Sequence, residues 1–467
     1  MKRLLLAALL AIPALGWAQG LSPEVLAEIS RGYSGSASDK ALHNALNSAP
    51  ISTLATRSDQ VMIDTHFSDK VKTKGRTDQK SSGRCWAFTG LNVLRAKMIS
   101  THNLGEFTFS QNYLFFYDQL EKANLFLQGI IDTRDLPMDD RTVDWFFKHP
   151  IGDGGQFTGV SNLVTKYGLV PSEAMPETYC SNNTSQMRTH ISTLLREDGL
   201  RLREAAAAFK GRGKKAEAEL EGKLQDMKKS QLKDIYHVLA ICLGVPPAEF
   251  EWTRYDSKGE FVSSKTYTPL SFYREFVGAD LEGGYVMLMN DPCREYYKVY
   301  EIQYDRHVYD GHNWVYLNLP MEDIKEMAIA SIKDDTAMYF SCDVGKFLNR
   351  KTGVGDLNNF DYESLLGVSF GMDKKERIST YASGSSHAMT LIAVDIRDGK
   401  PVKWMVENSW GASFGYKGNI IMTDQWFDEY MFRLVVEKKY VPARLLGYLE
   451  QKPVMLPAWD PMFLPEE

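Results

Sequence analysis

Hydrophobic residues recur at intervals of three and four along several stretches of the chain, a spacing typical of helices. The pattern over residues 85–94 predicts a helix that begins directly after a turn at Gly83-Arg84. Ser110 is expected to cap a second helix. A third helix should follow the tight turn at residues 152–155 and end at Gly168.

The composition shifts to Ala, Glu, Lys, Leu and Arg between Met187 and Leu243. Such a run of strong helix formers predicts a helical insertion, assigned to residues 187–265. A basic cluster inside it could contact nucleic acid or could be a solvated helix face. Interleaved glutamates favour the solvated face. The basic residues are Lys210, Arg212, Lys214 and Lys215, and the glutamates are Glu204, Glu217, Glu219 and Glu221.

The two ends of the chain have different patterns. Residues 19–60 are expected to form a helical N-terminal extension, interrupted by the turn-prone residues 47–50. From Thr266 onward, β-branched and aromatic runs alternate with turns, which is typical of strands. Three of these strands are predicted at residues 387–396, 402–408 and 418–424.

The composition is that of an ordinary soluble globular protein. The chain has 467 residues, of which 44% are hydrophobic and 24% charged, which excludes a disordered, collagen-like or disulfide-dense chain. The length fits about three domains, or one core with large insertions. Lys and Arg number 54 against 60 Asp and Glu, so a general nucleic-acid binder is not expected.

The N-terminus has the three-part pattern of a secretory signal peptide. Lys2 and Arg3 precede an apolar run from Leu4 to Gly16, and the sequence Gly16-Trp17-Ala18 suits a cleavage site. A membrane anchor is the weaker alternative, because the run is too short to span a bilayer. We therefore expect a signal peptide at residues 1–18, export to a periplasm or the medium, and no membrane association after its removal.

Five cysteines are present, and no pair has the spacing of a zinc or redox motif. Cys85 stands out because it opens a predicted helix. A thiolate is the nucleophilic form of cysteine, and the positive end of a helix dipole lowers the thiol pKa. The side-chain amide of Gln79, six residues earlier, could join the Cys85 backbone N–H in an oxyanion hole.

A cysteine nucleophile needs a base, and His387 is the best candidate among nine histidines. His387 begins a predicted strand, and Asn408 follows 21 residues later, directly before Ser409-Trp410. The Asn408 carbonyl could accept from one ring nitrogen of His387, and Trp410 could shield that bond. The competing pair His307 and His312 lacks a third metal ligand.

The motifs that carry this chemistry are similar to those of papain-type cysteine peptidases, and most of all to the bleomycin hydrolase and aminopeptidase C group. The resemblance covers nearly all of the chain after about residue 55. Its blocks are residues 79–86 (QKSSGRCW), 110–116, 174–178, 330–334, 342–346 (CDVGK), 387–388, 408–411 (NSWG) and 456–462 (LPAWDPM).

The resemblance implies an α+β fold in which a helical half, residues 61–186, carries Cys85. A β-rich half within residues 266–455 carries His387 and Asn408, and the cleft lies between the halves. The C-terminal arm, residues 456–467, is expected to lie in the cleft, with the carboxylate of Glu467 meeting the free amino group of a peptide substrate.

The resemblance further implies a cysteine aminopeptidase, without metal or cofactor, that assembles as a homohexamer. The backbone of Gly154 and Gly155 would bind the peptide, although an ordinary turn explains that pair equally well.

Two features depart from the family pattern: the signal peptide, and the tail Phe463-Leu464-Pro465-Glu466-Glu467 in place of a Gly-Ala-Leu-Ala-type end. The tail leaves an endopeptidase with an open cleft as the alternative function. A scaffold protein without activity is disfavoured, because such a protein has no need of Gln79, Cys85, His387 and Asn408 together.

Overall fold

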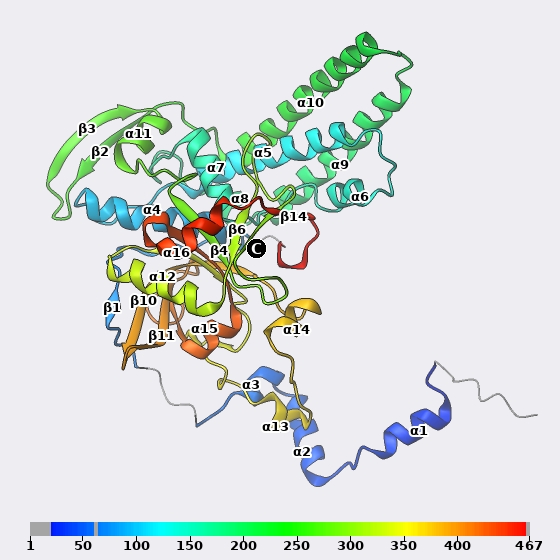
Figure 1. Cartoon of the computed structure of the whole chain (residues 1–467), viewed down its shortest axis with the longest axis vertical. Coiled ribbons are helices and arrows are strands. Elements are labelled where there is room, and N and C mark those ends of the chain that lie inside the picture. Colours follow the sequence, from blue (N-terminus) through cyan, green and yellow to red (C-terminus); the bar gives the residue numbers. More distant parts are fainter. Residues whose placement is uncertain (1–19, 60–63, 464–467) are drawn as a thin grey trace, which may run out of the picture. The chain divides into compact units, whose positions relative to one another are not determined.

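The computed structural model describes residues 20–59 and 64–463 (Figure 1). The described residues form two compact units. The smaller unit contains residues 20–58 and Phe360–Ser369, and the larger unit contains the rest. The predicted signal peptide and Glu467 lie outside the described residues.

The smaller unit is helical, as predicted for the N-terminal extension. Ser22 caps the first helix, and Ser36 with Asp39 forms a capping box at the second. Residues 47–50, predicted as a turn, separate the second helix from the third. The helices are α1 (Pro23–Arg31), α2 (Ala37–Leu46), α3 (Ile51–Ala55) and α13 (Tyr362–Leu366).

Most helices of the larger unit precede its large sheet in the sequence. Ser110 caps α5 by accepting from the Tyr113 N–H, as predicted. Helices α9 and α10 form a long pair beside α5 (Figure 1). The helices are α4 (Cys85–Thr101), α5 (Gln111–Asp132), α6 (Arg141–Lys148), α7 (Phe157–Tyr167), α8 (Tyr179–Asn182), α9 (Ser185–Ala208), α10 (Lys214–Leu243), α11 (Pro269–Phe276), α12 (Met321–Lys333), α14 (Lys374–Ser379), α15 (Asp424–Tyr430) and α16 (Ala443–Leu446), with short 3-10 turns at Lys438–Tyr440, Gly447–Glu450 and Pro461–Phe463.

The described strands form one 12-stranded sheet and one hairpin. The sheet order is β14-β5-β6-β4-β13-β7-β10-β11-β12-β9-β8, with β1 also paired to β10. The strands of the sheet are β1 (Asp69–Lys70), β4 (Tyr285–Met289), β5 (Lys298–Ile302), β6 (Val315–Asn318), β7 (Met338–Cys342), β8 (Leu348–Asn349), β9 (Val354–Gly355), β10 (His387–Arg397), β11 (Lys400–Glu407), β12 (Asn419–Thr423), β13 (Met431–Glu437) and β14 (Val454–Leu456).

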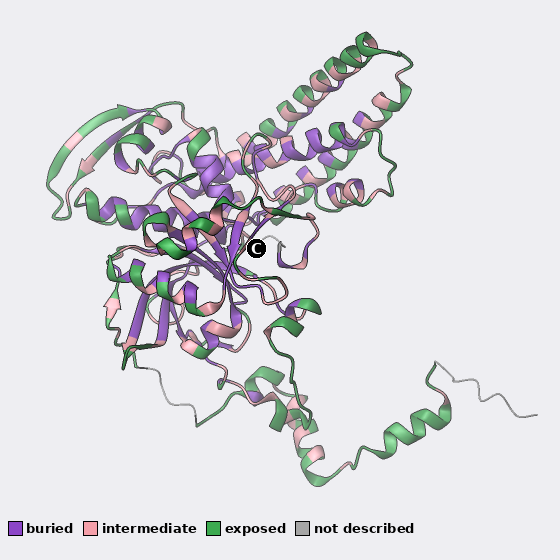
Figure 2. Cartoon of the chain, in the orientation of Figure 1, coloured by how far each residue is buried: buried purple, intermediate pink, exposed green. Residues whose placement is uncertain are grey.

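The central strands of this sheet are buried on both sides (Figure 2). Successive residues of a strand point to opposite faces, so each strand contributes to two hydrophobic clusters. Ala388 and Tyr339 belong to the cluster that includes α4 and α5. Met389 and Phe340 belong to the cluster that includes α12 and α15. Helix α4, which packs against β10 and β7, therefore lies directly on the sheet.

The range predicted as a helical insertion, residues 187–265, is helical only as far as Leu243. A hairpin of β2 (Phe250–Tyr255) and β3 (Phe261–Tyr267) follows. Its first strand alternates buried and exposed residues, and Trp252 packs edge-on against Phe272 with 5.0 Å between ring centroids. Alternation at a period of two is typical of a strand, so the helix-forming composition before Leu243 does not extend into this segment.

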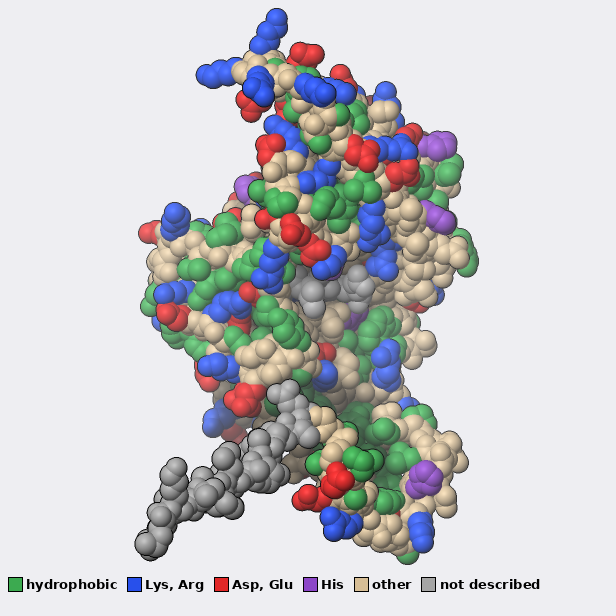
Figure 3. Space-filling view, turned by 90° about the vertical axis from the view of Figure 1, so that its right-hand side faces the viewer, with side chains coloured by type: hydrophobic (Ala, Val, Ile, Leu, Met, Phe, Trp, Pro, Cys, Tyr) green, Lys and Arg blue, Asp and Glu red, His purple; other side chains and the backbone are tan. Residues whose placement is uncertain are grey.

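Charged side chains of both signs cover the end of the molecule where the α9–α10 pair lies (Figure 3). This mixture agrees with the solvated helix face predicted there. In the part of the chain that the structure describes, no helix has both the length and the apolar character needed to cross a bilayer. The helical first half and the strand-rich second half agree with the predicted α+β class.

Candidate active site

Cys85 is the first residue of α4, as predicted. The helix is buried over most of its length, and Cys85 itself has no exposed surface. No side chain caps the N-terminus of α4. Cys85 therefore lies at the positive end of the helix dipole, a position that favours the thiolate.

The residue before Cys85 is anchored by a buried ion pair. Arg84 is fully buried and binds Glu177 through two hydrogen bonds of 3.1 and 2.8 Å. Its guanidinium also lies 5.2 Å from the ring centres of Phe88 and Phe115. Such a bidentate pair fixes orientation as well as position, so the backbone that leads into Cys85 is held rigidly.

Gln79 is held in the loop that precedes Cys85. Its Nε2 donates to the Ser82 carbonyl at 2.6 Å, and its Oε1 accepts from Ser409 Oγ at 2.6 Å. A primary amide has two N–H donors, so a second N–H of Gln79 can serve another acceptor. The Gln79 side chain also lines a cavity, as an oxyanion-binding role requires.

His387 and Asn408 meet because β10 and β11 form a hairpin. The turn residues Asp398 and Gly399 have φ angles of 50° and 76°, the left-handed values of a tight two-residue turn. His387 begins β10, and Asn408 follows the last residue of β11. The hairpin therefore brings Asn408 back beside His387, although 21 positions separate the two residues in the sequence.

The hydrogen bond between these two side chains determines the tautomer of His387. His387 Nε2 lies 2.8 Å from Asn408 Oδ1, which also accepts from the Ser409 N–H at 2.8 Å. Because Oδ1 is only an acceptor, Nε2 must carry the hydrogen, and Nδ1 is the nitrogen left for proton transfer. Trp410 stacks on the imidazole at 4.7 Å between ring centroids, so the bond lies away from water.

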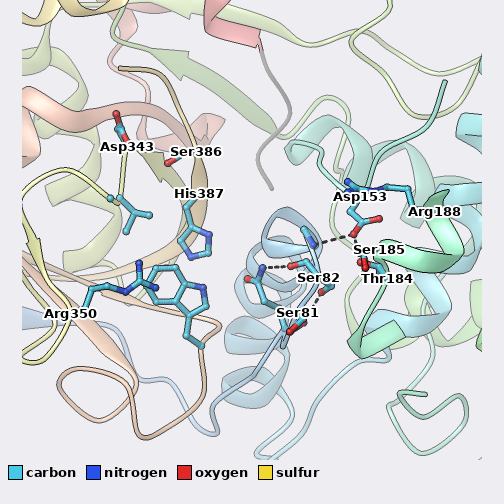
Figure 4. Close-up of a pocket in the computed structure, with 15 residues that line it drawn as sticks. Ser81, Ser82, Asp153, Thr184, Ser185, Arg188, Asp343, Arg350, Ser386 and His387 are labelled. Carbon is cyan, nitrogen blue, oxygen red and sulfur yellow. Dashed lines mark hydrogen bonds between the residues drawn. The ribbon is translucent and has the colours of Figure 1, made fainter. Parts of the chain in front are cut away.

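A cavity of about 400 Å³ brings these elements together (Figure 4). Gln79, Gly83 and Asp153 line it from the helical side, and His387 and Trp410 line it from the sheet side. The cavity thus joins the loop before Cys85 to the strand that carries the predicted base.

The two glycines predicted to bind peptide lie beside this cavity but are not among its lining residues. Lys122 Nζ donates to the carbonyls of Gly152 and Gly154 at 2.9 and 2.7 Å. Gly155 packs so closely that a Cβ there would lie 2.2 Å from His307 Cε1. This wall of the cleft therefore depends on a partly buried lysine and a buried histidine.

Asp118, Lys122 and His307 form a largely buried cluster of ionisable side chains that the sequence did not predict. Asp118 Oδ2 accepts from Lys122 Nζ at 2.9 Å, and Asp118 Oδ1 lies 2.6 Å from His307 Nδ1. The His307 ring packs edge-on against Trp86, the residue after Cys85, at 4.6 Å between centroids. The sequence contained only one local signal for this cluster, the spacing of four residues between Asp118 and Lys122 on a predicted helix.

Burial lowers the pKa of His307, and the nearby Lys122 lowers it further, although Asp118 opposes both effects. Burial alone would raise the pKa of Asp118, but Lys122 and His307 outweigh it and the pKa falls. At neutral pH the cluster therefore contains an ionised Asp118 and a neutral His307. Among the described residues, neither this cluster nor any other group of three His, Cys, Asp or Glu side chains is placed to hold a metal ion.

A family model described as the Peptidase C1-like family matches residues 20–463. The chain belongs to this family. Bleomycin hydrolase of Homo sapiens is 40% identical over 408 residues, which are 85% of this chain and 88% of that protein. Aminopeptidase G of Lactobacillus delbrueckii subsp. lactis is 40% identical over 394 residues, which are 84% of this chain and 88% of that protein. The crystal structure of PepW from Lactobacillus rhamnosis HN001 matches with a TM-score of 0.90 and 32% identity, over 96% of this chain and 99% of that one.

Membership in the Peptidase C1-like family confirms the resemblance and the papain-like α+β fold predicted from the sequence motifs. Gln79 and His387 line one cavity, and Asn408 lies behind His387 at hydrogen-bond distance. Cys85 is not among the lining residues and lies two residues beyond Gly83, which lines the cavity. The individual roles of these residues stay predictions. Ser409, which binds Gln79, was not predicted as a partner across the cleft.

The buried state of His307 predicts a pH dependence of stability. An unfolded histidine takes up a proton as the pH falls through about 6.5. Folded His307, with its lowered pKa, does not, so the unfolded state gains stability as the pH falls below that value. The melting temperature should therefore fall between pH 7 and pH 5, and His307→Gln should make this fall shallower. His312→Gln is the matched control, because His312 is exposed. Equal slopes in all three proteins would contradict the assignment.

Proposed function

We propose that this protein is a cysteine aminopeptidase, which removes the first residue of peptides that have a free amino terminus. The observation that carries the proposal is the 2.8 Å contact between His387 Nε2 and Asn408 Oδ1, on a cavity shared with the loop before Cys85. The names of the relatives, bleomycin hydrolase and aminopeptidase G, support this substrate class.

The proposed reaction is amide hydrolysis through an acyl-thioester. The Cys85 thiolate attacks the carbonyl carbon of the first peptide bond, and the developing oxyanion accepts hydrogen bonds from the Cys85 N–H and Gln79. His387 gives its proton to the leaving nitrogen as the C–N bond breaks. The same histidine then takes a proton from water, which attacks the thioester and releases the amino acid and the thiolate. Asn408 holds the imidazole in the tautomer that this sequence of steps needs.

The first test of this mechanism is substitution of the four residues. Cys85→Ala should lower kcat/KM for an aminoacyl-aminomethylcoumarin reporter by more than about 10³-fold, because the nucleophile is absent. His387→Ala should lower it by about 10²- to 10⁴-fold. Gln79→Ala and Asn408→Ala should cause smaller losses, because these groups support the other two. Cys293→Ser is the control, since this partly buried thiol lies outside the cavity. Substantial hydrolysis by Cys85→Ala would refute the nucleophile.

The C-terminal arm supports action on free amino termini. Arg433 donates to the Met462 carbonyl at 2.5 Å, and Arg141 stacks on Trp459 at 4.3 Å from its ring centre. A Cβ on Gly384, three residues before His387, would lie 3.8 Å from the Pro461 carbonyl oxygen. The arm is thus anchored close to the strand that carries the base. We propose that the terminal carboxylate of Glu467 pairs with the α-ammonium of the substrate and fills the space upstream of the cut.

This role of the arm predicts a strong dependence on the substrate amino group. Free peptides should lose one residue at a time, and N-acetylated peptides should hardly be cleaved. Deleting residues 463–467 should reduce this preference and allow cleavage of internal bonds. Glu466→Gln and Glu467→Gln are matched controls, because each keeps the chain length and the terminal carboxylate. If the intact enzyme cleaves acetylated peptides as fast as free ones and the deletion changes nothing, the endopeptidase alternative is correct.

We further propose that the protein is exported with cleavage after Ala18 and assembles as a homohexamer. Exposed apolar side chains on α1, including Leu26 and Ile29, support an oligomer because they have solvent in place of a partner in the single chain. Sequencing the N-terminus of the native protein should give Gln19, and light scattering should give six times the chain mass. An intact Met1 would refute export, and a monomer would refute the assembly.

A further inference from the structure

Arg350 lies against the tryptophan of the active-site cleft. Its guanidinium carbon is 5.0 Å from the ring centre of Trp410, and Trp410 stacks on His387. All three side chains line the same cavity, and Figure 4 shows Arg350 and His387 on the same side of it. A cation held on an indole face keeps its N–H donors at the edge of that face, where a ligand can reach them.

The loop that carries Arg350 is well anchored. Arg350 directly follows β8, and Asn349 Oδ1 accepts from the Lys351 N–H at 3.1 Å and the Thr352 N–H at 3.3 Å. The Asn349 carbonyl also accepts from the Gly353 N–H at 2.8 Å. These bonds hold the backbone at Arg350, so its place over Trp410 is set by the loop.

The positive charge of Arg350 is available to a ligand. Its side chain makes no ion pair with any residue among those the structure describes, and it is exposed. The two carboxylates that line the same cavity, Asp343 and Asp153, accept hydrogen bonds from other groups and form no ion pair with Arg350. Asp343 accepts from Ser383 Oγ at 2.7 Å, and Asp153 accepts from the Gly83 N–H at 3.2 Å and from the Thr184 hydroxyl.

The chemistry of the proposed reaction determines which part of a substrate meets Arg350. His387 gives its proton to the leaving nitrogen, so the second residue of the peptide must lie beside the imidazole. Trp410 covers one face of that imidazole, and Arg350 covers Trp410. The side chain or carboxylate of the leaving residue is therefore the substrate group nearest to Arg350.

We propose that Arg350 on Trp410 is a carboxylate-binding site for the leaving residue, an inference that rests on the proposed aminopeptidase activity. The enzyme then prefers peptides that carry a carboxylate on their second residue. That carboxylate is either the side chain of Asp or Glu or the free α-carboxylate of a dipeptide. Arginine suits either source, because its planar fork matches carboxylate geometry.

The test compares dipeptide amides that share one well-cleaved first residue and carry Glu, Gln or Lys second. An exposed ion pair predicts a kcat/KM about two- to five-fold higher for Glu than for Gln, with Lys the poorest. Arg350→Gln should abolish the preference, and Arg350→Glu should reverse it in favour of Lys. A merely structural role cannot produce that reversal. High salt should bring the Glu-to-Gln ratio towards one.

Lys351→Gln is the matched control, because it removes an adjacent positive charge that does not line the cavity. It should leave the Glu-to-Gln ratio unchanged. If Lys351→Gln lost the preference as strongly as Arg350→Gln, the preference would come from the general positive charge of the loop, and the Arg350 site would be refuted.

A comparison of free and amidated dipeptides that carry Ala as the second residue distinguishes the two carboxylate sources. If the coumarin reporter is cleaved but neither carboxylate is preferred, this inference fails alone. If the reporter is not cleaved, the proposed function fails and the inference falls with it.

Discussion

The carboxylate of Glu407 joins the two halves of the catalytic unit. It binds Arg95 of α4, and Arg76 lies 3.2 Å from its second oxygen. Both Arg95 and Glu407 are almost completely buried. Cys85 begins the helix that contains Arg95, and Asn408 follows Glu407 directly. This pair therefore sets the helix of the proposed nucleophile against β11, the strand that leads into Asn408. Leaving one partner of such a pair alone in the interior costs about 3–5 kcal/mol.

Short backbone pairing next to the cavity adds to this constraint. The Gln79 N–H donates to the Ser409 carbonyl at 2.8 Å, and the Gly411 N–H donates to the Thr77 carbonyl at 3.1 Å. Ser409 Oγ completes the contact by donating to Gln79 Oε1. The predicted oxyanion group is therefore bound to the residue after Asn408. A displacement of either half would therefore disturb the predicted oxyanion group and the His387–Asn408 pair together.

Local signals in the sequence were sufficient for the elements that carry the site. The apolar spacing after Cys85 predicted α4, Ser110 predicted the cap of α5, and the strands around His387 and Asn408 were predicted close to their observed bounds. These features depend on neighbours a few residues away. The pairs Glu407 with Arg95 and Arg350 with Trp410 join residues far apart in the chain. Their sequence neighbourhoods contain no period or motif for such contacts, so only the folded chain reveals them.

The two walls of the cleft differ in how firmly the core holds them. On the helical wall, Lys122 is bound to Asp118 and to the Gly154 carbonyl, and His307 leaves no room for a side chain at Gly155. A change there must move the buried, ionised Asp118, whose uncompensated charge costs several kcal/mol. On the sheet wall, Arg350 is exposed and reaches the site through the face of Trp410. The proposed selectivity for the leaving residue can therefore change at one exposed position, whereas the positions of the proposed reacting groups are tied to the core.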